Sequence, residues 1–260
     1  MESARGWQEF WAEFFRIRHR RCIAGIRDFD KRLVSHIIEA LAFHQGDRIL
    51  DLACGGGDQA AELARRGMEV VGVDIAQSLV DHGGRTAREE NLNVEFICGD
   101  MREERFSQDF NGCIILGAFG FFGDEGNSQV LSAVESALKR GGRLYIQGPN
   151  PLSRMRRPWK GWQEVEGGYV LMESNYDPGS GKTSDSFLYI RGDGELIRFS
   201  PKPEDVGFSI EMRLYTLPEM INLFAAAGLQ FESAYGSLRL PLEKYGISSE
   251  HLIVVAQKPL

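Results

Sequence analysis

The chain has 260 residues, of which 43% are hydrophobic and 26% charged, and its formal net charge at pH 7 is −7. These values exclude a disordered or collagen-like chain, and the length suits one large domain or a domain with an inserted subdomain. The negative charge argues against broad nucleic-acid affinity, which needs a basic surface. No run of 18 apolar residues is present, and the charged, aromatic N-terminus is unlike a secretory signal. We therefore expect a cytoplasmic protein without membrane association.

Residues 1–45 are expected to form two helices, Trp7–Arg21 and Asp30–Phe43, which we assign as a lid. The first carries an aromatic stripe at helical spacing, made of Trp7, Phe10, Trp11, Phe14 and Phe15. Such a stripe is typical of packing on a core, and the alternatives are a lid over a pocket or a contact between two copies. His19 lies at the basic end of this helix, where it is either solvated or a general base near neutral pH.

Residues 46–149 alternate short apolar runs with amphipathic stretches, which predicts a doubly wound α/β fold with a mostly parallel sheet. The expected strands are Arg48–Leu52, Glu69–Val73, Val94–Ile97, Gly112–Leu116 and Arg143–Gln147. The expected helices are Asp58–Arg66, Gln77–Glu90 and Asn127–Lys139, and glycines at 67 and 141 act as stop signals for the first and last.

Residues 150–213 are rich in Gly, Pro, Ser and Tyr and contain alternating segments joined by turns at PGSG and GDG. This pattern predicts an antiparallel β insertion, which we expect to cover a binding site at the carboxyl edge of the sheet. Residues 214–260 return to the main domain. They carry a helix that starts near Thr216 and Pro218 and ends before Gly228, and two last strands, Gln230–Tyr235 and His251–Ala256.

The segment ILDLACGGGDQAAEL is the sharpest local signal, a strand followed by a glycine-rich turn and a helix. Gly55, Gly57 and Ala60 satisfy the dinucleotide fingerprint, and Asp74 lies 19 positions after Gly55, where a ribose-binding acid is expected. This motif alone is compatible with an NAD enzyme.

Two further acids favour a different cofactor. Asp51 ends the first strand, where a carboxylate would repel a pyrophosphate but attract an ammonium group. Asp100 follows the third strand and is placed to accept a hydrogen bond from an adenine amino group, with Ile75 or Met101 against the ring. S-adenosylmethionine carries an ammonium and a sulfonium but no phosphate, so three acids after three successive strands favour this methyl donor over NAD.

At these residues the sequence resembles the class I S-adenosylmethionine-dependent methyltransferases, and in particular their bacterial small-molecule branch. The segments ILDLACGGG, VVGVDIAQSLV and FICGDMRE are similar to the first three motifs of that family. The resemblance covers roughly 30–259, is weakest in the insertion, and implies a seven-stranded Rossmann-like sheet whose last strand is antiparallel.

The resemblance also implies cofactor contacts. Asp51, Ala53 and Gly55 would line the methionine moiety, Asp74 the ribose, and Ile75, Asp100 and Met101 the adenine, with Leu116 below the sulfonium. Two positions depart from the family pattern, because Ala53 stands where Gly is more frequent and Gly117 where a larger residue is common. Neither departure removes a proposed side-chain hydrogen bond.

The sequence specifies the acceptor less well than the cofactor. The segment LGAFGFF lacks the Asp/Asn-Pro-Pro-Tyr pattern of nucleic-acid amine methyltransferases, and no acidic cluster or CxxC motif suggests a metal. Arg213 and Tyr215 are candidate catalytic residues, as is His19. Alternatively, Arg213 is only an exposed charge and Tyr215 only a packed ring. The basic segments RIRHRR and RMRRPWK favour an anionic acceptor, unless they form a solvated surface.

We therefore expect an enzyme, a monomer or homodimer, that methylates O or N of a small metabolite by in-line displacement. The alternatives are a noncatalytic module that binds S-adenosylmethionine and an NAD-dependent oxidoreductase.

Overall fold

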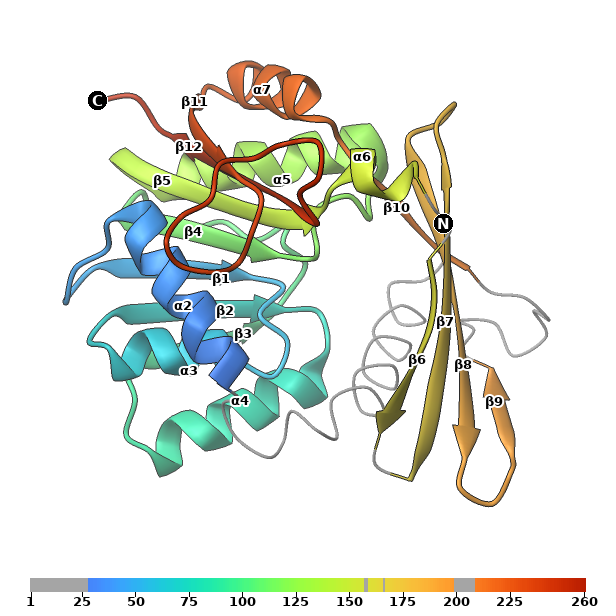
Figure 1. The fold of residues 1–260 in the computed structure, drawn as a ribbon. Coiled ribbons are helices and arrows are strands. Elements are labelled where there is room, and N and C mark those ends of the chain that lie inside the picture. Colours follow the sequence, from blue (N-terminus) through green and yellow to red (C-terminus); the bar gives the residue numbers. More distant parts are fainter. Residues whose placement is uncertain (1–27, 157–158, 166, 199–208) are drawn as a thin grey trace.

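The computed structural model describes residues 28–156, 159–165, 167–198 and 209–260, which form two β-sheets and their helices (Figure 1). The helices are α2 (Asp28–Leu41), α3 (Asp58–Arg65), α4 (Gln77–Glu89), α5 (Gly123–Ala137), α6 (Pro151–Arg154) and α7 (Leu217–Ala226). The first sheet contains β1 (Arg48–Leu52), β2 (Glu69–Asp74), β3 (Val94–Cys98), β4 (Phe110–Leu116), β5 (Leu138–Pro149), β11 (Gln230–Tyr235) and β12 (His251–Gln257). The second contains β6 (Trp159–Val165), β7 (Gly168–Asp177), β8 (Lys182–Arg191), β9 (Leu196–Arg198) and β10 (Ser209–Arg213). The helix expected over Trp7–Arg21, with His19, lies outside the described residues.

The first sheet has the strand order β3-β2-β1-β4-β5-β12-β11. Strands β1 to β5 pair in parallel, and β12 runs antiparallel to both β5 and β11. This arrangement confirms the predicted Rossmann-like fold with an antiparallel last strand. The strand order reverses between β1 and β4, so the carboxyl ends of β3, β2, β1 and β4 meet at one edge, which is where ligands of such folds bind.

Alternate side chains of β1 enter two different hydrophobic clusters, one on each face of the sheet. Ile49 packs with α2 and α3 through Val34, Ile37 and Leu63, whereas Leu50 and Leu52 pack with α5 and α7 through Val130, Leu131, Val134 and Phe224. Because helices cover both faces of the sheet, its central strands appear in the sequence as continuous apolar runs. Helix α2 is thus part of the core. A lid made of residues 1–45 stays a proposal, and it concerns the part of that segment before α2.

Helix α5 differs from the sequence prediction at both ends. Helix α5 begins at Gly123, four residues before the expected Asn127, and the acidic Asp124 and Glu125 in its first turn suit the positive end of the helix dipole. It ends at Ala137 instead of Lys139, because the fully buried Leu138 already pairs with Phe110 of β4.

The insertion forms the second sheet, with the order β10-β8-β7-β6 and β9 paired with β8. The predicted turns at PGSG and GDG connect β7 to β8 and β8 to β9, and Gly181 and Gly194 adopt positive φ there (68° and 87°). Buried Asn150 fixes the start of the insertion, since its Oδ1 accepts hydrogen bonds from Leu152 N and Tyr245 Oη. No helix in the described part of the chain is long and apolar enough to cross a membrane.

Candidate functional site

The predicted cofactor residues come from four adjacent parallel strands. Asp51 lies in β1, Asp74 ends β2, Asp100 follows β3 by two residues, and Leu116 ends β4. Because β3, β2, β1 and β4 are neighbours in this order, these residues and the loop positions next to them gather at one edge of the sheet. The sequence placed them on separate strands, and the topology brings them together.

Two glycines of the loop after β1 have different roles. Both adopt positive φ, 57° at Gly55 and 83° at Gly57. A Cβ added at Gly55 would meet no atom within 4 Å, whereas one at Gly57 would lie 2.3 Å from Phe96 Cζ. Gly55 also donates its N–H to Asp74 Oδ2 at 2.8 Å. Gly55 therefore leaves open space next to its hydrogen bond with Asp74, and Gly57 makes room for the Phe96 ring.

Asp51 is a buried carboxylate with an unpartnered oxygen. It is 2% exposed, and its Oδ2 has no hydrogen-bond partner. Burial, with a smaller contribution from the neighbouring Asp74, raises the pKa of Asp51 to about 8. A buried carboxyl group without a partner is costly, and an ammonium group placed beside Oδ2 would remove that cost. Asp51 therefore fits the amino group of a bound methionine moiety.

Asp74 is held in place by backbone N–H groups. Its Oδ1 accepts from Ala76 N at 2.9 Å and its Oδ2 from Gly55 N at 2.8 Å. Burial raises its pKa despite these bonds. Each carboxylate oxygen can accept a second hydrogen bond, so Asp74 can still bind two hydroxyls of a ribose while it shapes the glycine loop.

Asp100 has a partner that the sequence did not indicate. Arg102 donates its backbone N–H to Asp100 Oδ1 at 2.9 Å and its Nη2 to Oδ2 at 2.5 Å. Burial acts to raise the pKa of Asp100, but the bonds from Arg102 outweigh it and the pKa lies below its usual range. Asp100 is therefore ionised, and it would bind an adenine amino group through the oxygen lone pairs that Arg102 leaves. Met101 is buried beside it, and Ile75 is half-buried.

Ala53 occupies a left-handed backbone position, with φ of 58°. This conformation is unfavourable for a residue with a Cβ, by about 1–2 kcal/mol, but not for glycine. Alanine at this position, where glycine is more frequent in the family, thus imposes backbone strain. We expect Ala53→Gly to raise the free energy of unfolding by about 0.5–1 kcal/mol. Glycine removes the backbone strain, but it also raises the conformational entropy of the unfolded chain, which offsets part of the gain. Urea denaturation measures it.

Ala42→Gly is the matched control, because Ala42 also has a positive φ, 51°, and lies at the end of α2. If strain is the cause, both variants gain stability. A gain at Ala42 with a loss at Ala53 would show that the Ala53 methyl group makes contacts that outweigh its strain.

Arg213 and Tyr215, the candidate catalytic residues, lie in a network that joins the insertion to the main domain. Arg213 donates to Leu214 O at 2.7 Å and to Glu219 Oε1 at 2.6 Å, and its guanidinium carbon lies 4.7 Å from the Tyr215 ring centroid. Its backbone N–H donates to Gly120 O, in the loop after β4. Most polar groups of Arg213 thus already have partners, and its catalytic role stays a prediction.

Asn127 is a residue of this network that sequence reasoning missed. It is fully buried in α5, its Oδ1 accepts from Gly120 N, and its Nδ2 donates to Tyr215 Oη at 2.9 Å. Tyr215 in turn donates to Asp124 Oδ1 at 2.7 Å. An Asn at the expected start of a helix gives no sign of burial, since its partners lie in a loop and on a segment 88 residues away. The network holds the loop after β4 against the insertion.

For Tyr215 we expect a positioning role and not a role as base, because burial, followed by its hydrogen bond to Asp124, raises its pKa well above the ordinary value. Tyr215→Phe should lower the free energy of unfolding by about 1–2 kcal/mol, since Asn127 loses a buried acceptor. Chemical denaturation measures this loss, and a pH profile of turnover that keeps its shape supports positioning.

Tyr245→Phe is the control, because the Tyr245 hydroxyl also bonds a buried asparagine, Asn150 at 2.8 Å, outside this network. A fall in kcat of about 100-fold or more with unchanged stability, confined to Tyr215→Phe, would instead assign Tyr215 to proton transfer.

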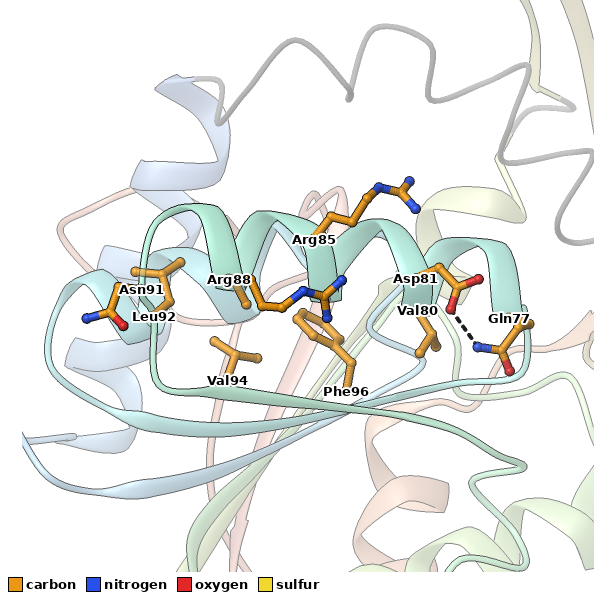
Figure 2. A pocket seen from close by; sticks show the side chains of 11 residues that line it. Gln77, Val80, Asp81, Arg85, Arg88, Asn91, Leu92, Val94 and Phe96 are labelled. Atoms are coloured by element: carbon orange, nitrogen blue, oxygen red, sulfur yellow. Dashed lines mark hydrogen bonds between the residues drawn. The ribbon is translucent and has the colours of Figure 1, made fainter.

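Two cavities lie near these elements. A groove of about 650 Å³ runs between α4 and β3 and is lined by Asp81, Arg85, Arg88 and Phe96 among others (Figure 2), but by none of the cofactor candidates. A cavity of about 30 Å³ is lined by Phe119, Arg213, Tyr215 and the end of β5. Within the described ranges, no group of three or more His, Cys, Asp or Glu residues is arranged to hold a metal ion.

Comparison with known sequences identifies the central part of the chain. The family model described as "Methyltransferase domain" matches residues 49–142. The biotin biosynthesis bifunctional protein BioHC of Cellvibrio japonicus is 32% identical over 121 residues, which are 44% of this chain and 22% of that protein. The ubiquinone/menaquinone biosynthesis C-methyltransferase UbiE of Proteus mirabilis is 32% identical over 116 residues, 43% of this chain and 46% of that protein. The matched region thus spans less than half the length of either relative.

Solved structures extend the likeness of fold to nearly the whole chain. The CcbJ methyltransferase of Streptomyces caelestis superposes with a TM-score of 0.74 at 18% identity, covering 92% of both chains. The sugar N-methyltransferase KedS8 of Streptoalloteichus superposes with a TM-score of 0.64 at 17% identity, covering 94% of this chain and 91% of that one. At such identities the likeness concerns the fold alone.

Proposed function

Since residues 49–142 match the family model of a methyltransferase domain and the first sheet has a Rossmann-like strand order, we propose that this chain is a class I S-adenosylmethionine-dependent methyltransferase that transfers the methyl group to O or N of a small-molecule metabolite. The single observation that carries this proposal is the buried Asp51 in β1, whose Oδ2 has no hydrogen-bond partner. An ammonium group beside Asp51 would favour the ionised carboxylate and neutralise it, whereas a pyrophosphate would disfavour that ionisation further. The NAD alternative thereby loses its support.

The chain's own residues bind and orient the cofactor, which supplies an electrophilic methyl group on a sulfonium. Asp51, Ala53 and Gly55 would hold the methionine moiety, and Asp74 would hold the ribose hydroxyls. Ile75, Asp100 and Met101 would contact the adenine, and Leu116 would lie near the sulfonium. In-line displacement depends mainly on alignment and exclusion of water, so a general base is needed only when the acceptor keeps its proton.

The acceptor binds, in this proposal, between the loop after β4 and the insertion sheet. The network of Asn127, Arg213 and Tyr215 fixes these two segments against each other. Relatives support a small acceptor, since KedS8 is named as a sugar N-methyltransferase and UbiE as a C-methyltransferase of quinone biosynthesis. Arg154, Arg156 and Lys160 are the described basic residues of the segment RMRRPWK, which favours an anionic acceptor. The insertion covers the site in this proposal, and a cytoplasmic location remains a prediction.

Calorimetric titration with S-adenosylmethionine, S-adenosylhomocysteine and NAD tests the cofactor. Binding of the first two without NAD is expected, and binding of NAD alone would overturn the proposal. An acceptor screen that measures S-adenosylhomocysteine release then separates an enzyme from a noncatalytic binding module, because only an enzyme shows acceptor-dependent turnover. Asp51→Asn is a better variant than Asp74→Ala here, because Asp74 also holds the backbone of Gly55 and Ala76.

A further inference from the structure

Strand β6 is an edge of the insertion sheet. It pairs with β7 through the register Trp162 to Leu171, and no strand in the described ranges pairs with its other side (Figure 1). An edge strand presents unpaired N–H and C=O groups and is therefore a template for another strand. β6 carries no proline at a described position.

An apolar row leads from the middle of the sheet to this edge. Leu188 pairs with Leu171, and Leu171 pairs with Trp162, so the three side chains share one face. Trp162 is 70% exposed, and Leu171 and Tyr169 on the same face are exposed as well. The Trp162 ring already contacts Tyr169, with ring centroids 5.8 Å apart. Trp162, the largest side chain of this row, is thus exposed to solvent at the edge of the sheet.

The charges on β6 are arranged symmetrically about Trp162. Lys160 precedes it by two residues and Glu164 follows it by two, and both are exposed on the face of Trp162. In an antiparallel pair of identical strands with Trp162 opposite Trp162, Lys160 of each copy faces Glu164 of the other. Registers that place Lys160 opposite Lys160, or Glu164 opposite Glu164, oppose like charges and are unfavourable.

We propose that β6 pairs antiparallel with β6 of a second copy of this chain, with Trp162 on the two-fold axis. The apolar row then runs Leu188, Leu171, Trp162 and continues through Trp162, Leu171 and Leu188 of the second copy. On the next row, the carboxylate of Glu173 lies 2.8 Å from Lys160 Nζ, and Glu164 of the second copy approaches Lys160 from the other side. The two insertion sheets become one continuous sheet, in which neither β6 strand is an edge. This inference is independent of the methyl-transfer proposal.

Disulfide cross-linking tests the two-fold axis directly. Residues opposite each other in an antiparallel pair have Cα atoms about 4.5–5.5 Å apart, which a disulfide spans. We expect the full chain with Trp162→Cys to form a covalent dimer on mild oxidation. Tyr169→Cys is the control, since Tyr169 pairs with Glu164 on the same face one strand further in. Its two copies would be about 20 Å apart, separated by three strand spacings across the sheet and about four residues along it. Equal cross-linking of the two variants, or none at Trp162→Cys, would overturn the proposal.

Sedimentation equilibrium tests the charge pairing. Lys160→Glu places like charges opposite each other twice, and we expect the dimer Kd to rise about tenfold or more. The double variant Lys160→Glu with Glu164→Lys restores opposite charges and should recover most of that loss. Lys182→Glu is the control, because it breaks another exposed ion pair of the same sheet, Lys182 with Glu211 at 3.0 Å, away from β6. A monomeric wild type, or a double variant weaker than Lys160→Glu, would contradict the proposed pairing.

Discussion

Asp51→Asn is expected to weaken S-adenosylmethionine binding by about 10- to 100-fold, the loss of one charge-assisted hydrogen bond of about 1.5–3 kcal/mol. The amide keeps the shape of the side chain but not its charge. Wild-type affinity should rise between about pH 6 and pH 8, because the pKa of Asp51 is raised to about 8 and its carboxyl must lose a proton before it pairs with an ammonium group. Titration calorimetry in buffers of different ionisation enthalpy measures that released proton.

The same substitution should stabilise the cofactor-free protein. In the unfolded chain an aspartate ionises near pH 4, whereas folded Asp51 keeps its proton until about pH 8. The unfolded state therefore binds fewer protons in this window, and stability falls as pH rises through it. Asparagine removes this cost, so at pH 8 the variant should gain about 1–3 kcal/mol, with less gain towards pH 4. Opposite effects on binding and stability identify a functional carboxylate. If Asp51→Asn weakened both equally, Asp51 would be a structural residue.

Gly57→Ala is expected to lower the free energy of unfolding by about 2–5 kcal/mol, combining the cost of a positive φ with overpacking. The added Cβ would lie 2.3 Å from Phe96 Cζ. The ring has little room to move, because a Cβ at Gly72 or Gly83 would also come within 3.0 Å of it. Three glycines, from the loop, from β2 and from α4, thus enclose one aromatic side chain of β3. Urea denaturation measures the loss.

Gly46→Ala controls for the backbone conformation, since Gly46 has a φ of 85° against 83° at Gly57 and no atom within 4 Å of an added Cβ. Gly46→Ala should lower the free energy of unfolding by about 1–2 kcal/mol, the cost of the positive φ without any overpacking. Phe96→Leu should make Gly57→Ala less damaging, so the two substitutions together should cost less than their sum. Equal losses at Gly46 and Gly57 would show that the ring yields to the methyl group.

Much of the candidate cofactor site could be predicted from sequence because its signals are local. The glycine turn after β1 and the acids near the ends of β1, β2 and β3 stand at fixed distances from strands that the apolar runs already mark. What remained hidden were partners far apart in the chain. The ion pair of Asp100 with Arg102 is the exception, a short-range contact that the sequence did not single out.

The acceptor side could not be predicted to the same extent. Arg213 and Tyr215 were found as candidates, but their partners Asn127 and Gly120 lie in α5 and in the loop after β4. An asparagine in a helix or a glycine in a loop is compatible with any role until its surroundings are known. The edge position of β6, on which the symmetry of Lys160 and Glu164 depends, follows from strand order and not from the segment itself.

The sequence by itself determined the succession of strands and helices, the antiparallel insertion and the type of cofactor, because hydrophobic period, turn chemistry and motif spacing act over a few residues. Only the tertiary structure decided that Asp51 has a buried oxygen without a hydrogen-bond partner, that Gly57 packs on Phe96, and that Tyr215 is held by Asn127. Burial and pairing depend on groups brought together from distant parts of the chain, and no local pattern specifies which groups will meet.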